Sequence, residues 1–248
     1  MAELARKIER IAKHALWAII GFFFGKKKSP PLPINFTSAS SVLVIRTDRL
    51  GDVVLSTPVY ESIKKSFPHL RVSVIVNRSN IPILTDNPNV DEIIPFSLKN
   101  LGTIIKQLRC NGFDIAFTLN KKFSVIASFL ALISKAQYKI GYAHDETTWL
   151  YDIRLPIDNQ PRHESLNNLE LLNYAGLTKI SKSPRLYFNE AEEKNITTIL
   201  NSLRKYPERP LILIKPGTRI EKWGWKVENF QVVAEKLSSS KKGEVFFI

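Results

Sequence analysis

The loop RTDRLGD (46–52) carries two arginines and two aspartates around one glycine, and it separates the apolar run VLVIR from a stretch of helical character. Asp52 has two interpretations: it caps the next helix, as aspartate often does, or it is a reactive carboxylate. Arg46 and Arg49 would hold a carboxylate ionised, and an ionised aspartate that meets a hydroxyl directly is a general base. The two arginines could also bind an acidic substrate.

A second loop, PGTRIEKWG (216–224), follows the apolar run LILIK. Gly217 and Thr218 precede Lys222, so backbone amides, a hydroxyl and an ammonium group could converge on a phosphate. The spacing GxxxxGK[ST] of a Walker A loop is absent. The alternative interpretation of this loop is a β-turn with a solvated lysine.

Both loops belong to an alternation of apolar strand-like runs with helical stretches. Near-continuous apolar strands separated by helices indicate a parallel sheet covered on both faces, so the predicted fold class is α/β and doubly wound. Ligands bind such sheets at the carboxyl ends of the strands, which is where both loops lie. The expected strands are 42–46, 72–76, 92–96, 114–119 and 138–142, and the expected helices lie near 79–85, 99–110, 122–135 and 163–177.

The sequence divides into three parts. Residues 1–36 read as a basic and apolar helix with a Pro- and Ser-rich linker, and residues 37–180 as a first Rossmann-like domain. Residues 181–248 begin a second alternation, with helices near 190–205 and 226–237 and strands at 211–215 and 244–248. A mononucleotide-binding half-fold usually continues through further βα repeats, so the second Rossmann-like domain is expected to be incomplete.

The amino-terminal segment MAELARKIERIAKHALWAIIGFFFGKKK has an apolar stretch between residues 15 and 25. This stretch is shorter than the roughly twenty residues that span a bilayer, and the lysines after it make a poor signal-peptide cleavage region. Lys and Arg on both sides of an apolar helix with Trp and Phe favour an amphipathic helix that lies in an anionic membrane surface. The alternative is a helix packed on the domain or on a second subunit.

The composition of the 248 residues narrows the classes of partner. The net charge of +13 points to an anionic partner, but no nucleic-acid-binding motif is present, so no nucleic-acid partner is expected. The single cysteine, Cys110, excludes an internal disulfide and is expected to be buried. The four histidines show no metal-ligand spacing, so no metal site is expected.

Taken in order, the motifs resemble those of glycosyltransferase family 9, the heptosyltransferases of the lipopolysaccharide inner core. The resemblance runs from about residue 42 to the end of the chain, and its first block is the most specific. It rests on VLVIRTDRLGDVVLSTPVYESIKKSFP, NPNVDEIIPF, FDIAFTLN, YKIGY, HESLNNLELLNYAGL and LILIKPGTRIEKWGW.

The resemblance implies a GT-B-like fold, with an acceptor-binding amino-terminal domain and a nucleotide-sugar-binding carboxy-terminal domain. It implies that Asp52 is the catalytic base of an inverting transfer and that Thr218 and Lys222 hold the diphosphate of an ADP-heptose-like donor, with no added cofactor. It also implies a lipid-anchored core oligosaccharide as acceptor, at the cytoplasmic face of the inner membrane. Arg46, Arg49, Lys121 and Lys122 are weaker candidates to bind an anionic acceptor.

The sequence departs from the family pattern in two places. By the resemblance, the later repeats of the second domain, which supply the adenosine pocket, are expected to lie beyond the pattern found here, and the amino-terminal helix is an addition. The alternative hypothesis is therefore a catalytically incomplete acceptor-binding protein, or a gene fragment, of the same family. A nucleic-acid-binding protein is a third hypothesis, and it rests on net charge alone.

Overall fold

The computed structural model describes residues 15–25, 33–158, 160–178, 181–218, 224–240 and 242–248. The chain separates into two compact units, Met1–Tyr187 and Phe188–Ile248. The sequence-based boundary lies between residues 180 and 181. Each unit is described by itself below.

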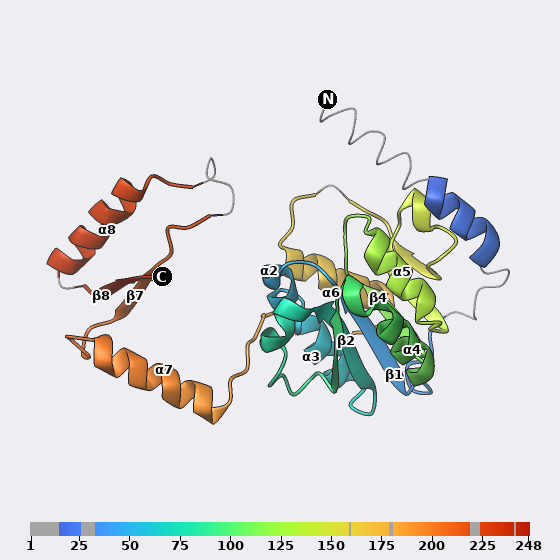
Figure 1. The fold of residues 1–248 in the computed structure, drawn as a ribbon, viewed down its shortest axis with the longest axis horizontal. Coiled ribbons are helices and arrows are strands. Elements are labelled where there is room, and N and C mark those ends of the chain that lie inside the picture. Colours follow the sequence, from blue (N-terminus) through green and yellow to red (C-terminus); the bar gives the residue numbers. More distant parts are fainter. Residues whose placement is uncertain (1–14, 26–32, 159, 179–180, 219–223, 241) are drawn as a thin grey trace. The chain divides into compact units, whose positions relative to one another are not determined.

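A six-stranded sheet forms the centre of the first unit (Figure 1). The strand order is β3-β2-β1-β4-β5-β6, and every neighbouring pair is parallel. The predicted doubly wound parallel sheet is therefore confirmed. The strands are β1 (Ser41–Arg46), β2 (Arg71–Asn77), β3 (Glu92–Phe96), β4 (Ile115–Thr118), β5 (Tyr138–Tyr142) and β6 (Ile153–Leu155).

The apolar runs become strands because both faces of the sheet are covered. Side chains alternate between the two faces of a strand, so Val42 and Val44 of β1 join one buried cluster, while Leu43 and Ile45 join the other. All four are fully buried. Such a strand needs an apolar residue at every position, which is why these runs are nearly continuous in the sequence.

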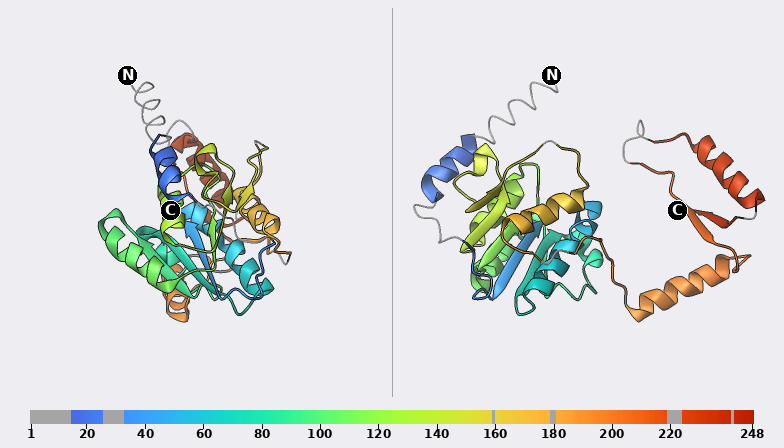
Figure 2. Two further views of the ribbon diagram at one scale, coloured as in Figure 1. Left: turned by 90° about the vertical axis from the view of Figure 1, so that its right-hand side faces the viewer. Right: turned by 180° about the vertical axis from the view of Figure 1, so that it is seen from behind.

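Helices cover the two faces of the sheet (Figure 2). Side chains of α3 and α6 enter one buried cluster, and side chains of α4 and α5 enter the other. The short helix α2 lies between β1 and α3. The bounds are α2 (Leu50–Val54), α3 (Thr57–Ser66), α4 (Leu101–Asn111), α5 (Val125–Ile133) and α6 (Glu164–Tyr174).

Three local expectations were wrong. The helix expected near 79–85 is a 3₁₀ helix, η1 (Arg78–Ile83), because Pro82 inside it has no N–H for an α-helical hydrogen bond. Strand β6 was missed because it has only three residues. Cys110 is exposed, since the inward positions of α4 are occupied by Ile104 and Leu108. The remaining short 3₁₀ helices are η2 (Leu98–Asn100) and η3 (Asp145–Thr147).

The second unit begins with α7 (Glu190–Leu203) and continues as a β-α-β unit: β7 (Leu211–Ile214), α8 (Val227–Ser239) and β8 (Glu244–Phe247). Strands β7 and β8 are parallel, with Leu211 opposite Glu244. At the start of α7, the Oδ1 of Asn189 accepts the Glu192 N–H at 2.9 Å, a side-chain cap. This unit matches the predicted second alternation.

Residues 15–24 are helical and belong to the first unit. Their Trp17 is fully buried in the same apolar cluster as α4 and α5. Within the described part of the chain, no helix has the length and apolar character required to cross a membrane. The rest of the predicted amino-terminal helix lies outside the described residues.

Candidate active site

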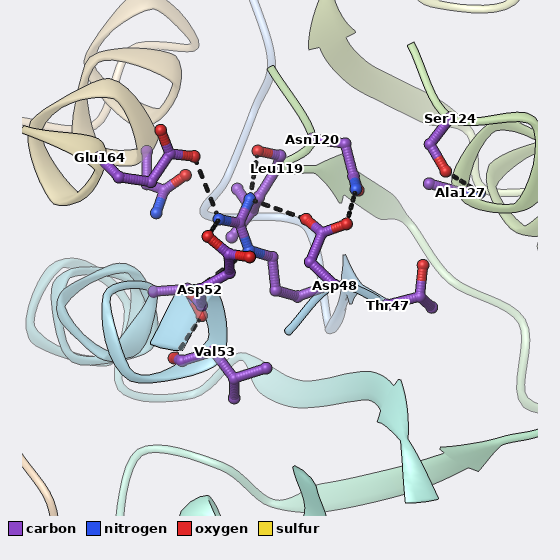
Figure 3. Close-up of polar contacts among 12 residues, drawn as sticks. Thr47, Asp48, Asp52, Val53, Leu119, Asn120, Ser124, Ala127 and Glu164 are labelled. Carbon is purple, nitrogen blue, oxygen red and sulfur yellow. Dashed lines mark hydrogen bonds and ion pairs between the residues drawn. The ribbon is translucent and has the colours of Figure 1, made fainter. Parts of the chain in front are cut away.

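Arg46, the last residue of β1, is the centre of a charged cluster at the carboxyl edge of the sheet (Figure 3). Its side chain is only 1% exposed. Its Nη1 donates to the Leu119 carbonyl at 2.6 Å, and its Nε donates to the Asp52 carbonyl at 3.3 Å. Three carboxylates surround the guanidinium at 3.1–3.5 Å, those of Asp48, Asp52 and Glu164.

Asp52 lies in the first turn of α2 and is held at both carboxylate oxygens. Its Oδ2 accepts the backbone N–H of Arg49 at 3.3 Å, and its Oδ1 is 3.5 Å from Nη2 of Arg46. The side chain is still 35% exposed. Both interpretations of this residue therefore fit: the carboxylate satisfies a helix amide and remains open to a hydroxyl from solvent.

Asp48 is a second carboxylate in the same loop, and its environment differs from that of Asp52. Its Oδ1 accepts a hydrogen bond from Nδ2 of Asn120 at 2.6 Å, and its Oδ2 is 3.5 Å from Nη1 of Arg46. Burial raises the pKa of Asp48, and the neighbouring Asp52 carboxylate adds to that rise, against the opposing effect of Arg46. Asp48 is thus the more enclosed carboxylate of the loop, held by a side-chain amide as well as by Arg46.

Glu164 completes the cluster from a distant part of the chain. It is the first residue of α6, and its Oε1 accepts from Nη2 of Arg46 at 3.1 Å, while its Oε2 accepts from Nδ2 of Asn167 at 3.2 Å. With all groups ionised, three carboxylates and one guanidinium give −3 + 1 = −2. The cluster therefore carries an excess of negative charge.

Amide side chains fix the backbone of the loop. Nδ2 of Asn77 donates to the carbonyls of Thr47 at 2.7 Å and Asp48 at 3.1 Å. Nδ2 of Asn80 donates to the same Asp48 carbonyl at 3.0 Å. Asn77 ends β2 and Asn80 lies in η1, so the neighbouring strand sets the position of the loop.

The other residues predicted for the site lie in different places. Arg49 and Lys122 are exposed, and Nζ of Lys121 is 3.5 Å from the Asp158 carboxylate. Gly217 and Thr218 follow β7 in the second unit, and Lys222 lies outside the described residues. The structure brings Arg46 and Asp52 together. The acceptor and donor roles of the other residues stay predictions.

Sequence reasoning missed Glu164, Asn77, Asn80 and Asn120. Two of them carried a usable signal, because Asn77 and Asn120 each come directly after an apolar run of the sequence (72–76 and 114–119), at the edge where ligands bind. Glu164 carried none, since nothing in a single sequence pairs it with Arg46. Among the described residues, no group of three or more His, Cys, Asp or Glu side chains is arranged to hold a metal ion.

Asp48→Asn is expected to stabilise the protein at pH 7. Because the pKa of Asp48 is raised in the folded state, the protonated carboxyl group stabilises the fold, and this stabilisation is complete below the unfolded pKa of about 3.9. It is lost as the pH rises through the folded-state pKa. Asparagine stays neutral at every pH, so the variant avoids that loss. The difference from the wild type, measured by urea unfolding, should shrink below about pH 4.

Asp114→Asn is the matched control, with the opposite sign. Oδ2 of Asp114 accepts from the N–H and hydroxyl of Ser40 at 2.7 and 2.8 Å and from the N–H of Ser41 at 3.0 Å. Burial alone would raise the pKa of Asp114, but these hydrogen bonds lower it. Its contribution is therefore present above the unfolded pKa and lost in acid. If both variants shifted in the same direction at pH 7, the account of Asp48 would be wrong.

Comparison with solved structures identifies the fold class of the chain. A crystal structure of a glycosyl transferase family 9 protein from Veillonella parvula has a TM-score of 0.76 at 21% identity, over 87% of this chain and 63% of that one. The E. coli heptosyltransferase WaaC with ADP has a TM-score of 0.60 at 17% identity, over 84% and 66%. WaaC with ADP-2-deoxy-2-fluoro heptose gives 0.59 at 18% identity, over 84% and 68%. The fold is GT-B-like.

The chain belongs to glycosyltransferase family 9. The model of that family, described as glycosyltransferase family 9 (heptosyltransferase), matches residues 101–248, which is more than half of the chain. The match includes Asn120 and Glu164, whereas Arg46 and Asp52 precede it. The predicted resemblance to this family is confirmed.

Two curated relatives belong to lipopolysaccharide synthesis by name. The lipopolysaccharide heptosyltransferase 3 of Escherichia coli K12 is 24% identical over 197 residues, which cover 75% of this chain and 57% of that protein. The lipopolysaccharide core heptosyltransferase OpsX of Haemophilus influenzae is 25% identical over 210 residues, which cover 82% and 58%. The chain thus spans somewhat more than half the length of these relatives.

Proposed function

We propose that the chain carries the acceptor side, and part of the donor side, of an inverting glycosyltransferase. In this proposal a heptose or related sugar moves from an ADP-heptose-like donor to the inner core of lipopolysaccharide. Family membership and the names of the two relatives support heptosyl transfer. The observation that carries the proposal is the Asp52 carboxylate, which is paired with Arg46 and still 35% exposed at the carboxyl edge of the sheet.

In the proposed reaction, Asp52 accepts the proton of an acceptor hydroxyl while that oxygen bonds to the anomeric carbon of the donor. The bond from this carbon to the diphosphate oxygen breaks on the opposite face, and its electron pair leaves with the nucleoside diphosphate. The configuration at the carbon is therefore inverted. Arg46 and the Arg49 amide hold one oxygen each, which orients the base before the acceptor arrives.

The negative charge of the cluster indicates which group of the acceptor contacts Asp52 and which groups bind elsewhere. An excess of two negative charges around Arg46 disfavours the phosphates or carboxylates of an acceptor at that point, so an uncharged hydroxyl is the group that meets Asp52. We assign the anionic groups of the acceptor to Arg49, Lys121 and Lys122 at the periphery. Arg46 is buried and engaged on all sides, so its proposed role is to position Asp52.

The proposed donor contacts lie in the second unit. Gly217 and Thr218 follow the carboxyl end of β7, which is where a Rossmann-like unit binds phosphate. With Lys222 they would hold the donor diphosphate and stabilise the charge of the leaving group. ADP and an ADP-sugar analogue in the WaaC structures support an adenosine diphosphate donor. No further cofactor is part of the proposal.

The proposed place of the reaction is the cytoplasmic face of the inner membrane. A lipid-anchored core oligosaccharide is confined to a membrane, so its transferase meets it at the membrane surface. A net charge of +13 would draw the protein to anionic lipid. Nucleic acid is not among the proposed partners.

Lys222→Ala is expected to weaken binding of an ADP-sugar by about tenfold or more, because a hydrogen bond to a charged group contributes about 1.5–3 kcal/mol. Isothermal titration calorimetry of the chain with ADP-heptose measures this loss. Lys242→Ala, which changes an exposed lysine of the same unit, is the control and should bind as the wild type does.

Unchanged binding in Lys222→Ala would remove this lysine from the donor site. Absence of ADP-heptose binding by the unmodified chain would favour the alternative function, a catalytically incomplete acceptor-binding protein of the same family.

A further inference from the structure

The helical residues 15–24 pack one face on the first unit. Trp17 is fully buried, with its ring centroid 5.6 Å from that of Trp149 and 6.1 Å from that of Phe123. Gly21 lies directly against Trp149, since a Cβ there would come within 2.6 Å of the indole nitrogen. The helix thus packs on the domain through the buried ring of Trp17, and Gly21 allows the close approach to Trp149 because it has no side chain.

The opposite face of the helix is apolar, and no other part of the chain that the structure describes covers it. Leu16, Ile19 and Phe23 recur at helical spacing on one stripe and are 50%, 57% and 72% exposed. Phe22, beside them, is 85% exposed, and its ring contacts that of Phe23 with centroids 5.3 Å apart. Single exposed apolar residues are ordinary, but a contiguous group on a short helix marks an interaction surface.

The sequence on both sides of this helix is basic, and that composition points to its partner. Residues 1–28 contain seven Lys or Arg and two Glu, a formal excess of 7 − 2 = +5. An apolar helix face flanked in sequence by basic residues suits the surface of an anionic bilayer, where phosphates can meet the basic groups and acyl chains the apolar ones. A protein partner with an apolar docking surface would not require this excess of positive charge.

One loop joins the helix to the charged cluster. Asn120 donates to the Asp48 carboxylate, and Phe123, three residues later, packs on Trp17. Both follow β4, at the edge of the sheet that carries Asp52. In Figure 1 the blue helix lies on the α5 side of the first unit.

We propose that residues 15–24 lie in the surface of an anionic membrane and hold the carboxyl edge of the first unit toward it. A membrane-anchored acceptor then reaches Asp52 without leaving the bilayer. The delivery of acceptor rests on the proposed function, whereas the membrane contact does not.

The test is sedimentation of the 248-residue chain with vesicles of phosphatidylglycerol and phosphatidylethanolamine. The double variant Phe22→Ser, Phe23→Ser should lower the bound fraction by about tenfold or more, since burial of one Phe side chain is worth about 1.5–3 kcal/mol. Phe188→Ser is the matched control, because Phe188 is 68% exposed in the second unit. It should bind as the wild type does, and binding to neutral phosphatidylcholine vesicles should be weaker in all three proteins.

Two outcomes would overturn the proposal. One is equal vesicle binding by the double variant and the wild type. The other is a wild-type dimer that ignores vesicles and becomes monomeric in the double variant, which would assign the face to a second copy of the chain.

Transfer assays separate this proposal from the proposed function. The double variant should lose transfer to a vesicle-embedded acceptor and keep transfer to the same oligosaccharide freed of lipid. Vesicle binding by a wild-type protein that glycosylates neither acceptor would support the membrane contact and overturn the proposed function.

Discussion

Asp52→Asn is expected to lower the proposed sugar-transfer rate by about 10²–10⁴-fold, the usual contribution of a general base, which is the role proposed for Asp52. Asparagine keeps an oxygen that can accept the Arg49 N–H, so the local structure should persist while the proton acceptor is lost. Single-turnover transfer measures the chemical step, and calorimetry should show donor affinity close to that of the wild type. A fall in rate with donor binding intact is the result expected when an interaction acts only in the transition state.

The control for this experiment is Asp86→Asn. Asp86 is an exposed aspartate between η1 and β3, in a different connection of the sheet from Asp52. Its variant should transfer sugar at the wild-type rate. If Asp52→Asn also kept most of that rate, Asp52 would be a helix-capping residue and the base would have to be sought elsewhere.

Arg46→Met is expected to lower the free energy of unfolding by about 2–4 kcal/mol. Methionine fills much of the buried volume but leaves the Leu119 carbonyl without its donor and removes the cation between three carboxylates. Removing one partner of a buried ion pair is costly because the remaining charges lose their compensation. Partial exposure of the carboxylates, 30–35%, keeps the loss below that of a fully buried cluster.

Arg71→Met is the control for Arg46→Met, because it also removes an arginine from a strand, but one that is not buried among three carboxylates. Arg71 begins β2, is 54% exposed and pairs with Glu92 at 3.1 Å, so its removal should cost at most about 1 kcal/mol. Urea unfolding of both variants measures the difference. Equal losses in the two variants would contradict the central role of Arg46.

The fold was largely predictable because most of its strands are recognisable in the sequence as apolar runs. Runs such as VLVIR and VSVIV have an apolar residue at almost every position, which only a strand buried on both faces requires. The three-residue β6 lacks such a run and was missed. In η1 the pattern was compatible with a helix, but Pro82 limits it to 3₁₀ geometry.

The site was predictable in part for the same reason. Arg46 and Asp52 share one short loop after a strand, so their proximity follows from the topology. The contact of Arg46 with Glu164 joins residues 118 positions apart, and only the packing of α6 against the sheet makes it. Periodicity reports which side of an element faces the core, but not which polar side chains of distant elements meet.

The packing of the amino-terminal helix on the first unit could not be predicted from the sequence in full. Its apolar length and flanking charge were readable, as was the possibility that it packs on the domain. The role of Gly21 was not, because it depends on Trp149, far along the chain. The sequence offered membrane and domain as alternatives, whereas Trp17 and Phe23 point to different sides of the helix.

The asparagines around the loop bear on how the loop responds to acid. Asn77 and Asn80 hold the backbone carbonyls of Thr47 and Asp48 through carboxamides, and neither the amides nor these carbonyls gain or lose protons as the pH changes. Asn120 is different, because it donates to the Asp48 carboxylate, which does titrate. Acidification therefore alters the contacts of the carboxylates while the two hydrogen-bonded carbonyls of the loop keep their donors.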